Sequence, residues 1–530
     1  MRKRIVSRGL GRHIKRDPMI PLRRIPSNSQ PTGHPSSAPL SKADVRNIFY
    51  GLMLGMFLSA LNQTIVATAL PTIGRDLGNF DDLSWVIIAY LLSSTVVSPL
   101  YGKLSDIHGR RAMMLVALGL FVAGSALSAA APGMATLIAG RALQGIGGGG
   151  IVPLTQTTIA DMITPRERGR YQAYMGTSWI VAGVAGPALG GLVAEHLHWS
   201  VIFWLNVPFG AFAALLTNRA MKRLPRHDRP HRLDLLGAAL MMLAATVLLI
   251  ALTSGGTRLP WLSLEIITLT ALSIVLTVAF VWWLRVAPEP FLPLTVLANP
   301  VMRAGTAATS CTLGAVLGLT VYMPFYFQVV HKLSAADAGF ALIPIVVMTT
   351  PGSMLSGRSM MYLRRYKISA IAGASIAIAS VTALAIWPDM PVAGVVVALT
   401  LIGFGVGTVY PIATVSIQNA VPMTQVGTAT GAMNFFRALA STLAVAVLGA
   451  ILLAGLGVTP ERGAAVGRLI ESAGGVGVDL AGVFRLVFVA ADIFIGLALL
   501  AVLAMEERPL RGPTTNAPAV APEARPAPAE

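Results

Sequence analysis

Long apolar runs recur along most of this chain, and they constrain its fold more than any other feature. About twenty apolar residues are enough for a helix to cross the hydrocarbon core of a bilayer. Transmembrane barrel strands are shorter and alternate apolar with polar residues, which these runs do not. The sequence therefore predicts an all-α polytopic membrane protein with fourteen transmembrane helices, at residues 45–70, 83–104, 111–130, 135–160, 171–193, 198–220, 234–253, 262–286, 301–329, 337–358, 368–387, 392–417, 429–455 and 481–505.

Charge supports this topology. Only 12% of the 530 residues are charged and 55% are hydrophobic, whereas about a quarter of the residues of a soluble domain are charged. With the N-terminus inside, Lys and Arg gather in the inner loops, and the outer loops hold only Arg75, Arg258, Lys332, Arg462 and Arg468. The positive-inside rule then predicts a multi-pass protein of the cell (inner) membrane with both termini cytoplasmic. The net charge of +17 therefore reflects topology, and no basic face with interleaved aromatic residues indicates nucleic-acid binding.

The predicted helices fall into groups. Residues 45–220 form an N-terminal six-helix half, 221–299 a cytoplasmic loop with helices 7 and 8, and 300–505 a C-terminal six-helix half. We expect disorder in two tails, the basic segment 1–44, which lacks the apolar core of a signal peptide, and the Ala/Pro-rich segment 506–530. Two similar halves are typical of secondary transporters, whose substrate site lies between the halves near the midplane.

The turn after the second predicted helix is short, charged and punctuated by glycine, reading GKLSDIHGRR over 102–111. Asp106 and Asp161 each lie at the inner end of a helix, where the helix dipole is negative, so each should seek a cation or the N-terminus of another helix. We predict a charge latch that favours one gate state; an ordinary positively charged inner loop is the alternative. The residues of the predicted latch are Gly102, Asp106, Gly109, Arg110, Arg111 and Asp161.

The 102–111 stretch resembles the signature of the loop between helices 2 and 3 in the major facilitator superfamily (GxLaDrxGrr), with Ile107 where Arg is usual. The resemblance covers about residues 45–505, and the number of spans is similar to that of the fourteen-span drug:proton antiporter branch. It implies two six-helix halves plus an extra helix pair. It also implies a proton-coupled multidrug efflux transporter, with a role in antibiotic resistance and no enzymatic activity.

Glycines recur along the predicted helix 171–193. Gly183, Gly186 and Gly190 fall on one helical face, where small residues permit close helix approach, and Pro187 removes a backbone donor. Tight packing alone would explain this pattern. Together with Gly191, however, the stretch also resembles the GPxxGG antiporter motif of drug exporters, which implies export.

Three ionisable residues within spans are candidates for proton coupling: Arg141, Asp492 and Arg437. Arg141 begins RALQG, which resembles a helix 4 motif associated with proton transfer, although a long side chain there could instead reach the outer interface. Asp492 is the only carboxylate deep within a predicted span, and Arg437 is a possible partner; a structural ion pair or a polar cavity lining are the alternatives. The fourteen-span relatives usually carry Asp where this chain has Asn62, which cannot exchange a proton.

Aromatic and amide side chains within the spans suit a pocket for amphiphilic ligands. Taken singly, each is more typical of the core or of an interfacial belt. The predicted cavity residues are Asn62, Gln63, Trp85, Tyr90, Gln144, Gln156, Trp179, Tyr322, Phe325, Tyr326, Gln328, Tyr410, Gln418 and Asn434.

The expected partners are small amphiphilic substrates, protons and the lipid bilayer, and we expect a functional monomer. The sequence has no GxxxxGK[ST] nucleotide cradle, no metal-ligand spacing and one cysteine, Cys311, so we expect no nucleotide, metal or other cofactor. A transporter of one specific metabolite, lipid or siderophore on the same scaffold is the main alternative. A membrane enzyme or sensor would need an interfacial cluster of His, Asp or Glu, which we do not find.

Overall fold

The computed structural model describes residues 41–78, 82–223, 233–256, 258–456 and 479–510. The regular secondary structure of these residues is helical, apart from one isolated bridge between Gly255 and Leu259. The helices are α1 (Lys42–Leu77), α2 (Trp85–His108), α3 (Arg110–Ala129), α4 (Met134–Met162), α5 (Pro165–His196), α6 (Val201–Ala220), α7 (Leu235–Ser254), α8 (Leu264–Val286), α9 (Leu294–Leu297), α10 (Pro300–Val329), α11 (Ala335–Val347), α12 (Thr349–Tyr362), α13 (Lys367–Ile386), α14 (Val392–Ala420), α15 (Val426–Gly455) and α17 (Leu480–Ala504).

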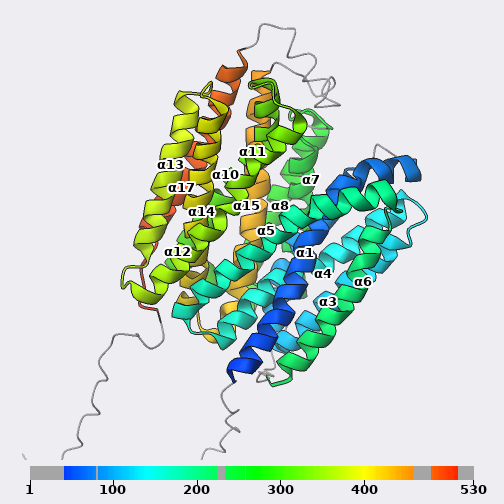
Figure 1. The fold of residues 1–530 in the computed structure, drawn as a ribbon. Coiled ribbons are helices and arrows are strands. Elements are labelled where there is room, and N and C mark those ends of the chain that lie inside the picture. The colour runs from blue at the N-terminus through cyan, green and yellow to red at the C-terminus, as the bar shows by residue number, and fades with distance from the viewer. Residues whose placement is uncertain (1–40, 79–81, 224–232, 257, 457–478, 511–530) are drawn as a thin grey trace, which may run out of the picture. The chain divides into compact units, whose positions relative to one another are not determined.

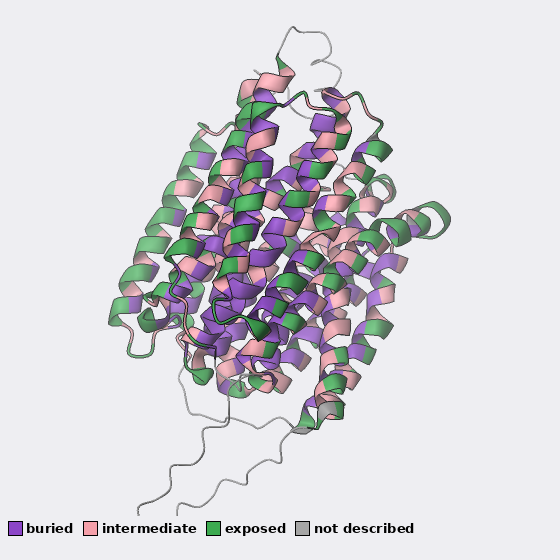
Figure 2. Ribbon diagram, turned by 60° about the vertical axis from the view of Figure 1, so that its left-hand side comes forward, coloured by how far each residue is buried: buried purple, intermediate pink, exposed green. Residues whose placement is uncertain are grey.

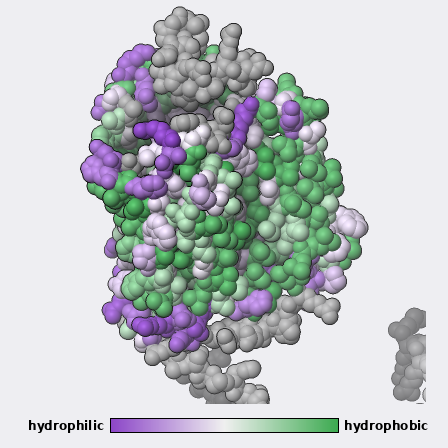
Figure 3. Space-filling model, turned by 90° about the vertical axis from the view of Figure 1, so that its right-hand side faces the viewer, coloured by the Kyte–Doolittle hydropathy of each residue, from purple (hydrophilic) through white to green (hydrophobic). Residues whose placement is uncertain are grey.

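Every predicted span falls on helix, and the span at 337–358 consists of two helices, α11 and α12, joined at Met348. Within the described residues, 13 helical segments are long and apolar enough to cross a membrane. The helix α4 is not among them, because its apolar residues are diluted by Gly147–Gly150, Gln144 and Gln156. The exposed surface fits a lipid environment: on the face drawn in Figure 3, apolar residues cover the middle and hydrophilic residues gather towards the two ends.

The predicted tails lie largely outside the described residues, which exclude 1–40 and 511–530. Where they are described, they are ordered. The helix α1 begins at Lys42, inside the predicted tail, because Ser41 and Asp44 form a reciprocal capping box. At the other end, the segment Met505–Leu510 packs on the helices: Leu510 is buried, and the Tyr366 hydroxyl donates to the Arg508 carbonyl.

Two sets of helices pack among themselves. In one set α1 contacts α5 and α6, and α4 contacts α2 and α3; in the other, α10 contacts α14, α15 and α17, and α13 contacts α14 and α17. Figure 1 shows the first set in blue to green and the second in yellow-green to red. The contacts between the sets run chiefly through α2 with α15 and α5 with α12, while α7 pairs with α8 and also contacts α2 and α15. Buried residues lie on the facing sides of these helices (Figure 2).

Glycine allows α4 to pack against two neighbours at backbone distance. A Cβ on Gly147 would overlap backbone atoms of Phe121 and Ala117 on α3, and a Cβ on Gly149 would overlap the backbone of Ser94 on α2. This close packing explains why α4, which is rich in glycine, is mostly buried.

Adding a single methyl group at this contact should therefore be costly. We expect Gly147→Ala to lower the stability of the folded protein by about 1–3 kcal/mol, as overpacking does, and so to reduce its melting temperature in detergent. Gly119→Ala is the matched control, because no atom lies within 4 Å of its added Cβ. Equal melting temperatures for the two variants would contradict this packing.

Candidate functional site

The charged turn at 102–111 places three side chains in contact. Arg110 lies between the two carboxylates: its Nη1 is 2.6 Å from Asp106 Oδ1 and its Nε is 2.8 Å from Asp161 Oδ2. Gly109, between α2 and α3, has φ of 86°, a conformation that favours glycine. The turn thereby places Arg110, the first residue of α3, in contact with the last turns of α2 and α4.

Asp106 also reaches the N-terminus of α15. Its Oδ1 accepts from the Gly427 amide (3.0 Å), and its Oδ2 accepts from the Thr428 amide (2.7 Å) and hydroxyl (2.8 Å). These amides belong to the first turn of α15, where the backbone N–H groups have no acceptor within the helix. The positive end of the helix dipole lies at the same place. Both kinds of partner that the dipole argument calls for are therefore present. We call Asp106, Arg110, Gly427 and Thr428 the α2–α15 latch.

The other predicted members of this group have different contacts. Gly102 lies against α15, where an added Cβ would overlap the Gly427 carbonyl. Arg111 does not join the carboxylates, contrary to the prediction. Its Nε and Nη2 donate to Asn218 on α6 (3.0 and 2.5 Å), because successive residues at the start of α3 point to different neighbours.

The glycine motif of α5 packs on α1 through only part of its length. An added Cβ on Gly186 would overlap Thr64, and one on Gly190 would overlap Thr68, whereas nothing lies within 4 Å at Gly183 or Gly191. The prediction that all three glycines permit close helix approach is therefore wrong at Gly183. Pro187 is exposed, and α5 continues through it.

Arg141 is fully buried in a polar network between α1, α2, α4 and α6. Its Nε donates to the Val86 carbonyl (2.8 Å), its Nη1 to Gln144 Oε1 (2.5 Å), and its guanidinium lies over the ring of Tyr90. Gln144 in turn donates to Asn62 Oδ1 (3.1 Å). Arg141 thus does not extend to the outer interface, because these partners hold its head inside the bundle.

A second network joins the two helix sets. Gln156 on α4 donates to the Tyr410 hydroxyl on α14 (2.5 Å) and accepts from Asn434 on α15 (2.7 Å). Arg437 Nη2 donates to Asn434 Oδ1 (2.8 Å), and the guanidinium lies 4.7 Å from the centre of the Tyr410 ring.

Asp492 does not pair with Arg437, contrary to one of the predicted arrangements. Its Oδ2 accepts from the Thr382 hydroxyl on α13 (2.8 Å), and its Oδ1 is buried without a hydrogen-bond partner. The reason is rotational: α17 packs chiefly on α10 and α13, so Asp492 faces α13 rather than Arg437.

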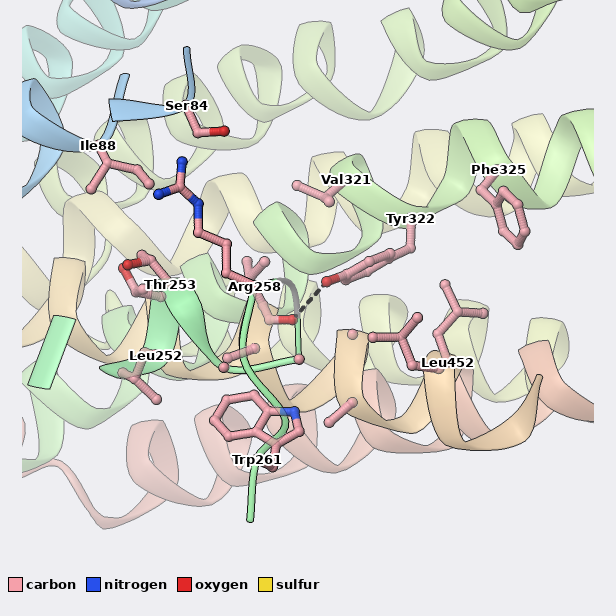
Figure 4. Close-up of a pocket in the computed structure, with 18 of the residues that line it drawn as sticks. Ser84, Ile88, Leu252, Thr253, Arg258, Trp261, Val321, Tyr322, Phe325 and Leu452 are labelled. Atoms are coloured by element: carbon pink, nitrogen blue, oxygen red, sulfur yellow. Dashed lines mark hydrogen bonds between the residues drawn. The ribbon is translucent and has the colours of Figure 1, made fainter. Parts of the chain in front are cut away.

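A cavity of about 720 Å³ opens between α2, α10, α15 and the α7–α8 turn. Tyr322 and Phe325 line it, as predicted for a cavity, and the Tyr322 hydroxyl donates to the Val445 carbonyl (Figure 4). Arg258 and Trp261 also line it, and Arg258 lies over the ring of Trp85. The sequence predicts Arg258 only as a charge of an outer loop. An Arg and a Trp close together in one short turn could have indicated a binding surface there.

Several predicted cavity residues lie elsewhere. Tyr326 is buried in the α10–α17 core against Phe484 and Phe488, and its hydroxyl donates to the Pro388 carbonyl, so its placement in a cavity is wrong. Gln418 is buried and donates to Thr430. None of the other ten predicted residues lines the 720 Å³ cavity either. Gln63 and Gln328 are half-buried and Trp179 is exposed. The rest are Trp85, which lies under Arg258, and the members of the networks above, Asn62, Tyr90, Gln144, Gln156, Tyr410 and Asn434.

The segment after α10 carries a titratable group outside the helices. His331 Nε2 lies 3.1 Å from the Tyr326 hydroxyl. Burial lowers the pKa of His331, and the nearby Asp389 carboxylate opposes that shift without cancelling it. Within the described residues no three His, Cys, Asp or Glu side chains are grouped closely enough to hold a metal ion.

Comparisons with known proteins agree with this architecture. The profile of the Major Facilitator Superfamily matches residues 52–445. The multidrug transporter protein MdtP of Bacillus subtilis is 32% identical over 404 residues, which are 76% of this chain and 74% of that protein. Multidrug resistance protein 3 of the same organism is 32% identical over 410 residues, 77% of this chain and 80% of that protein.

A solved structure shows the same fold. A bacterial homologue of the iron transporter ferroportin, in its outward-facing state, aligns with a TM-score of 0.59 over 87% of this chain and 100% of that chain. The sequences are 12% identical, so the likeness concerns the fold alone.

Proposed function

This chain belongs to the major facilitator superfamily, and on that premise we propose that it exports amphiphilic, drug-like compounds across the cytoplasmic membrane by proton antiport and alternating access. Family membership makes it a multi-pass membrane transporter and not an enzyme. The relatives named as multidrug transporters support export of such compounds. In this proposal α4 also crosses the membrane, which brings the number of spans from thirteen to fourteen. Both termini are cytoplasmic, and the protein acts as a monomer that needs no cofactor.

The two moving parts are proposed to be residues 45–220 and 300–505, with the helix pair in 221–299 between them. The observation that carries the proposal is the α2–α15 latch, in which a carboxylate of one helix set caps a helix of the other. Latch and cavity lie at opposite ends of the same two helices. Asp106 ends α2 and Gly427 begins α15, whereas the cavity is lined by Ser84 and Ile88 at the start of α2 and by the later part of α15.

Alternating access requires a state in which the transport path is closed at the inner face and open at the outer face, and this arrangement matches that state. The helix sets are joined at the inner face, and a cavity is open at the outer face. Release of Asp106 from α15 would let the inner ends separate, and rocking would close the outer cavity. Gly186, Gly190 and their contacts with α1 would keep the first helix set rigid during that motion.

The direct test is transport in everted membrane vesicles. A panel of neutral, cationic and acidic amphiphiles is offered with and without an imposed pH gradient. We expect accumulation of several compounds, abolished when the gradient is collapsed. Transport of none of them under a full gradient would contradict the proposal.

One observation favours a second candidate, a transporter of a single metabolite, lipid or siderophore. Asn62 is buried and uncharged, with its Oδ1 accepting from Gln144 and Asn206. This fixed network contains the Arg141 guanidinium and, among the described residues, no carboxylate, so it suits one ligand better than a range of cationic drugs. Strict selectivity in the vesicle panel would favour this candidate.

Asp492 is our candidate for proton coupling, because its buried Oδ1 has no partner and can carry a proton. We expect Asp492→Asn to abolish uphill export driven by a pH gradient while leaving ligand binding intact. Thr382→Val is the control, since it removes the hydrogen bond to Asp492 and keeps the carboxyl. If Asp492→Asn still exports uphill at the wild-type rate, Asp492 does not couple protons.

A further inference from the structure

Arg437 is a membrane-embedded cation whose hydrogen bonding is incomplete. It lies in the middle of α15, half-buried, with its guanidinium over the Tyr410 ring and its Nη2 bonded to Asn434. Its Nε is buried and has no hydrogen-bond partner. Tyr410 and Asn434 thus fix the direction of the guanidinium, while its Nε–H group donates no hydrogen bond to any described residue.

Arg437 has no acidic counterpart in the described part of the chain. The carboxylates described there lie in the first or last turn of a helix or in connecting segments, with the exception of Asp492. Asp492 faces Thr382 on α13 instead. A charged side chain at this depth is costly unless it is paired or faces a water-filled cavity.

Arg437 does not itself line the outer cavity, but it lies in the contact between the two helix sets. Tyr410 and Asn434, which hold it, are both bonded to Gln156, and so they lie where the two helix sets meet. Thr442, five residues further along α15, lines the outer cavity. At 1.5 Å per residue this places Arg437 about 7.5 Å deeper along the helix axis.

We infer that Arg437 is the anion subsite of an acidic amphiphile, a molecule with a carboxylate or similar acid group on an apolar body. A guanidinium presents parallel N–H donors that match a carboxylate, and such charge-assisted bonds are strong in a partly desolvated site. The apolar part would lie against the cavity wall of Phe325, Tyr322 and Trp261. A cationic amphiphile would meet Arg437 as a like charge. This inference rests on the proposed export function, because it takes the cavity to be the substrate path.

The test uses a matched pair of probes, 11-(dansylamino)undecanoic acid and its methyl ester, which differ in the acid group. Binding to the purified full chain in lipid nanodiscs is measured by dansyl fluorescence, with protein-free nanodiscs as the partition blank. We expect the acid to bind at least tenfold more tightly than the ester. Arg437→Gln should weaken the acid roughly 10- to 100-fold and leave the ester unchanged, since a bond to a charged group is lost.

Two further variants separate the site from general charge and folding effects. Arg437→Lys keeps the charge without the planar fork, so it should retain part of the acid preference. Arg485→Gln removes an exposed Arg of α17 and should leave both affinities unchanged. If the acid and the ester bind the wild-type protein equally, or if Arg437→Gln weakens both equally, the inference is overturned; the first comparison needs no variant to fold.

Transport of the same two probes in everted vesicles distinguishes this inference from the proposed function. Proton-driven export of both at equal rates, with Arg437→Gln slowing neither selectively, would sustain the export function and overturn the anion subsite. Selective binding of the acid through Arg437 without export of any compound would sustain the subsite and overturn the export function.

Discussion

Asp106→Asn is expected to reduce export in energised vesicles at least tenfold while leaving the yield of folded protein near that of the wild type. Asp106 accepts hydrogen bonds from Arg110, Thr428 and the Gly427 amide. Asn has one acceptor oxygen, and its NH2 group would face donors on α15. Loss of the charge also removes the favourable interaction with the positive end of the α15 dipole, worth up to about 2 kcal/mol in a partly buried site.

Asp161→Asn is the matched control for this prediction. Asp161 contacts the same Arg110, but its side chain is 27% exposed against 6% for Asp106, and its hydrogen bond runs to Arg110 and not to the described residues of α15. Its loss should therefore lower export by a factor of about two or three, as expected for an exposed ion pair. Equal losses in the two variants, or a normal export rate in Asp106→Asn, would show that the contact with α15 is not what matters.

Arg141→Met is expected to destabilise the folded protein by about 3 kcal/mol or more, because the buried Val86 carbonyl and Gln144 Oε1 each lose a donor. The stacking of the guanidinium on Tyr90 is lost as well. The measurement is the thermal unfolding temperature of the purified protein. The effect should be among the largest of any single substitution, since the site is inaccessible to water that could replace the lost bonds.

Arg141→Lys and Arg485→Met complete this experiment. Arg141→Lys keeps the charge but not the two directed bonds, so its unfolding temperature should lie between those of the wild type and Arg141→Met. Arg485, which is exposed, should be replaceable by Met with little change. A stable Arg141→Met variant that had lost proton-driven export alone would instead favour a direct role in proton transfer.

Local rules account for much of what could be predicted from the sequence. Hydropathy placed every predicted span on helix, because a helix in lipid must satisfy its backbone internally and cover itself with apolar side chains; thirteen helical segments of the described residues are long and apolar enough to cross a membrane. The dipole argument stated correctly that Asp106 needs a cation or a helix N-terminus. It could not name α15, since Gly427 is 321 positions away and nothing local specifies which helix end arrives.

Two of the errors share one physical cause, which is the rotation of each helix about its axis. Asp492 was considered as a partner of Arg437, but α17 turns it towards Thr382. Tyr326 was expected in a cavity, but its face of α10 packs on Phe484 and Phe488. An almost uniformly apolar span has little periodicity, so its sequence does not show which side faces a neighbour.

The central claim is that the α2–α15 latch holds the inner ends of the two helix sets together and opens during transport. A distance measurement between these ends tests it most directly. The chain has one cysteine, so Cys311→Ser gives a background in which spin labels can be placed at His108, the exposed last residue of α2, and at the exposed Met423 just before α15.

Pulsed electron spin resonance in nanodiscs would then report the distribution of the label separation. We expect one short distance with intact Asp106, and a second, longer population when Asp106→Asn is added. An unchanged distribution in that variant would contradict the claim that the latch joins the two helix sets.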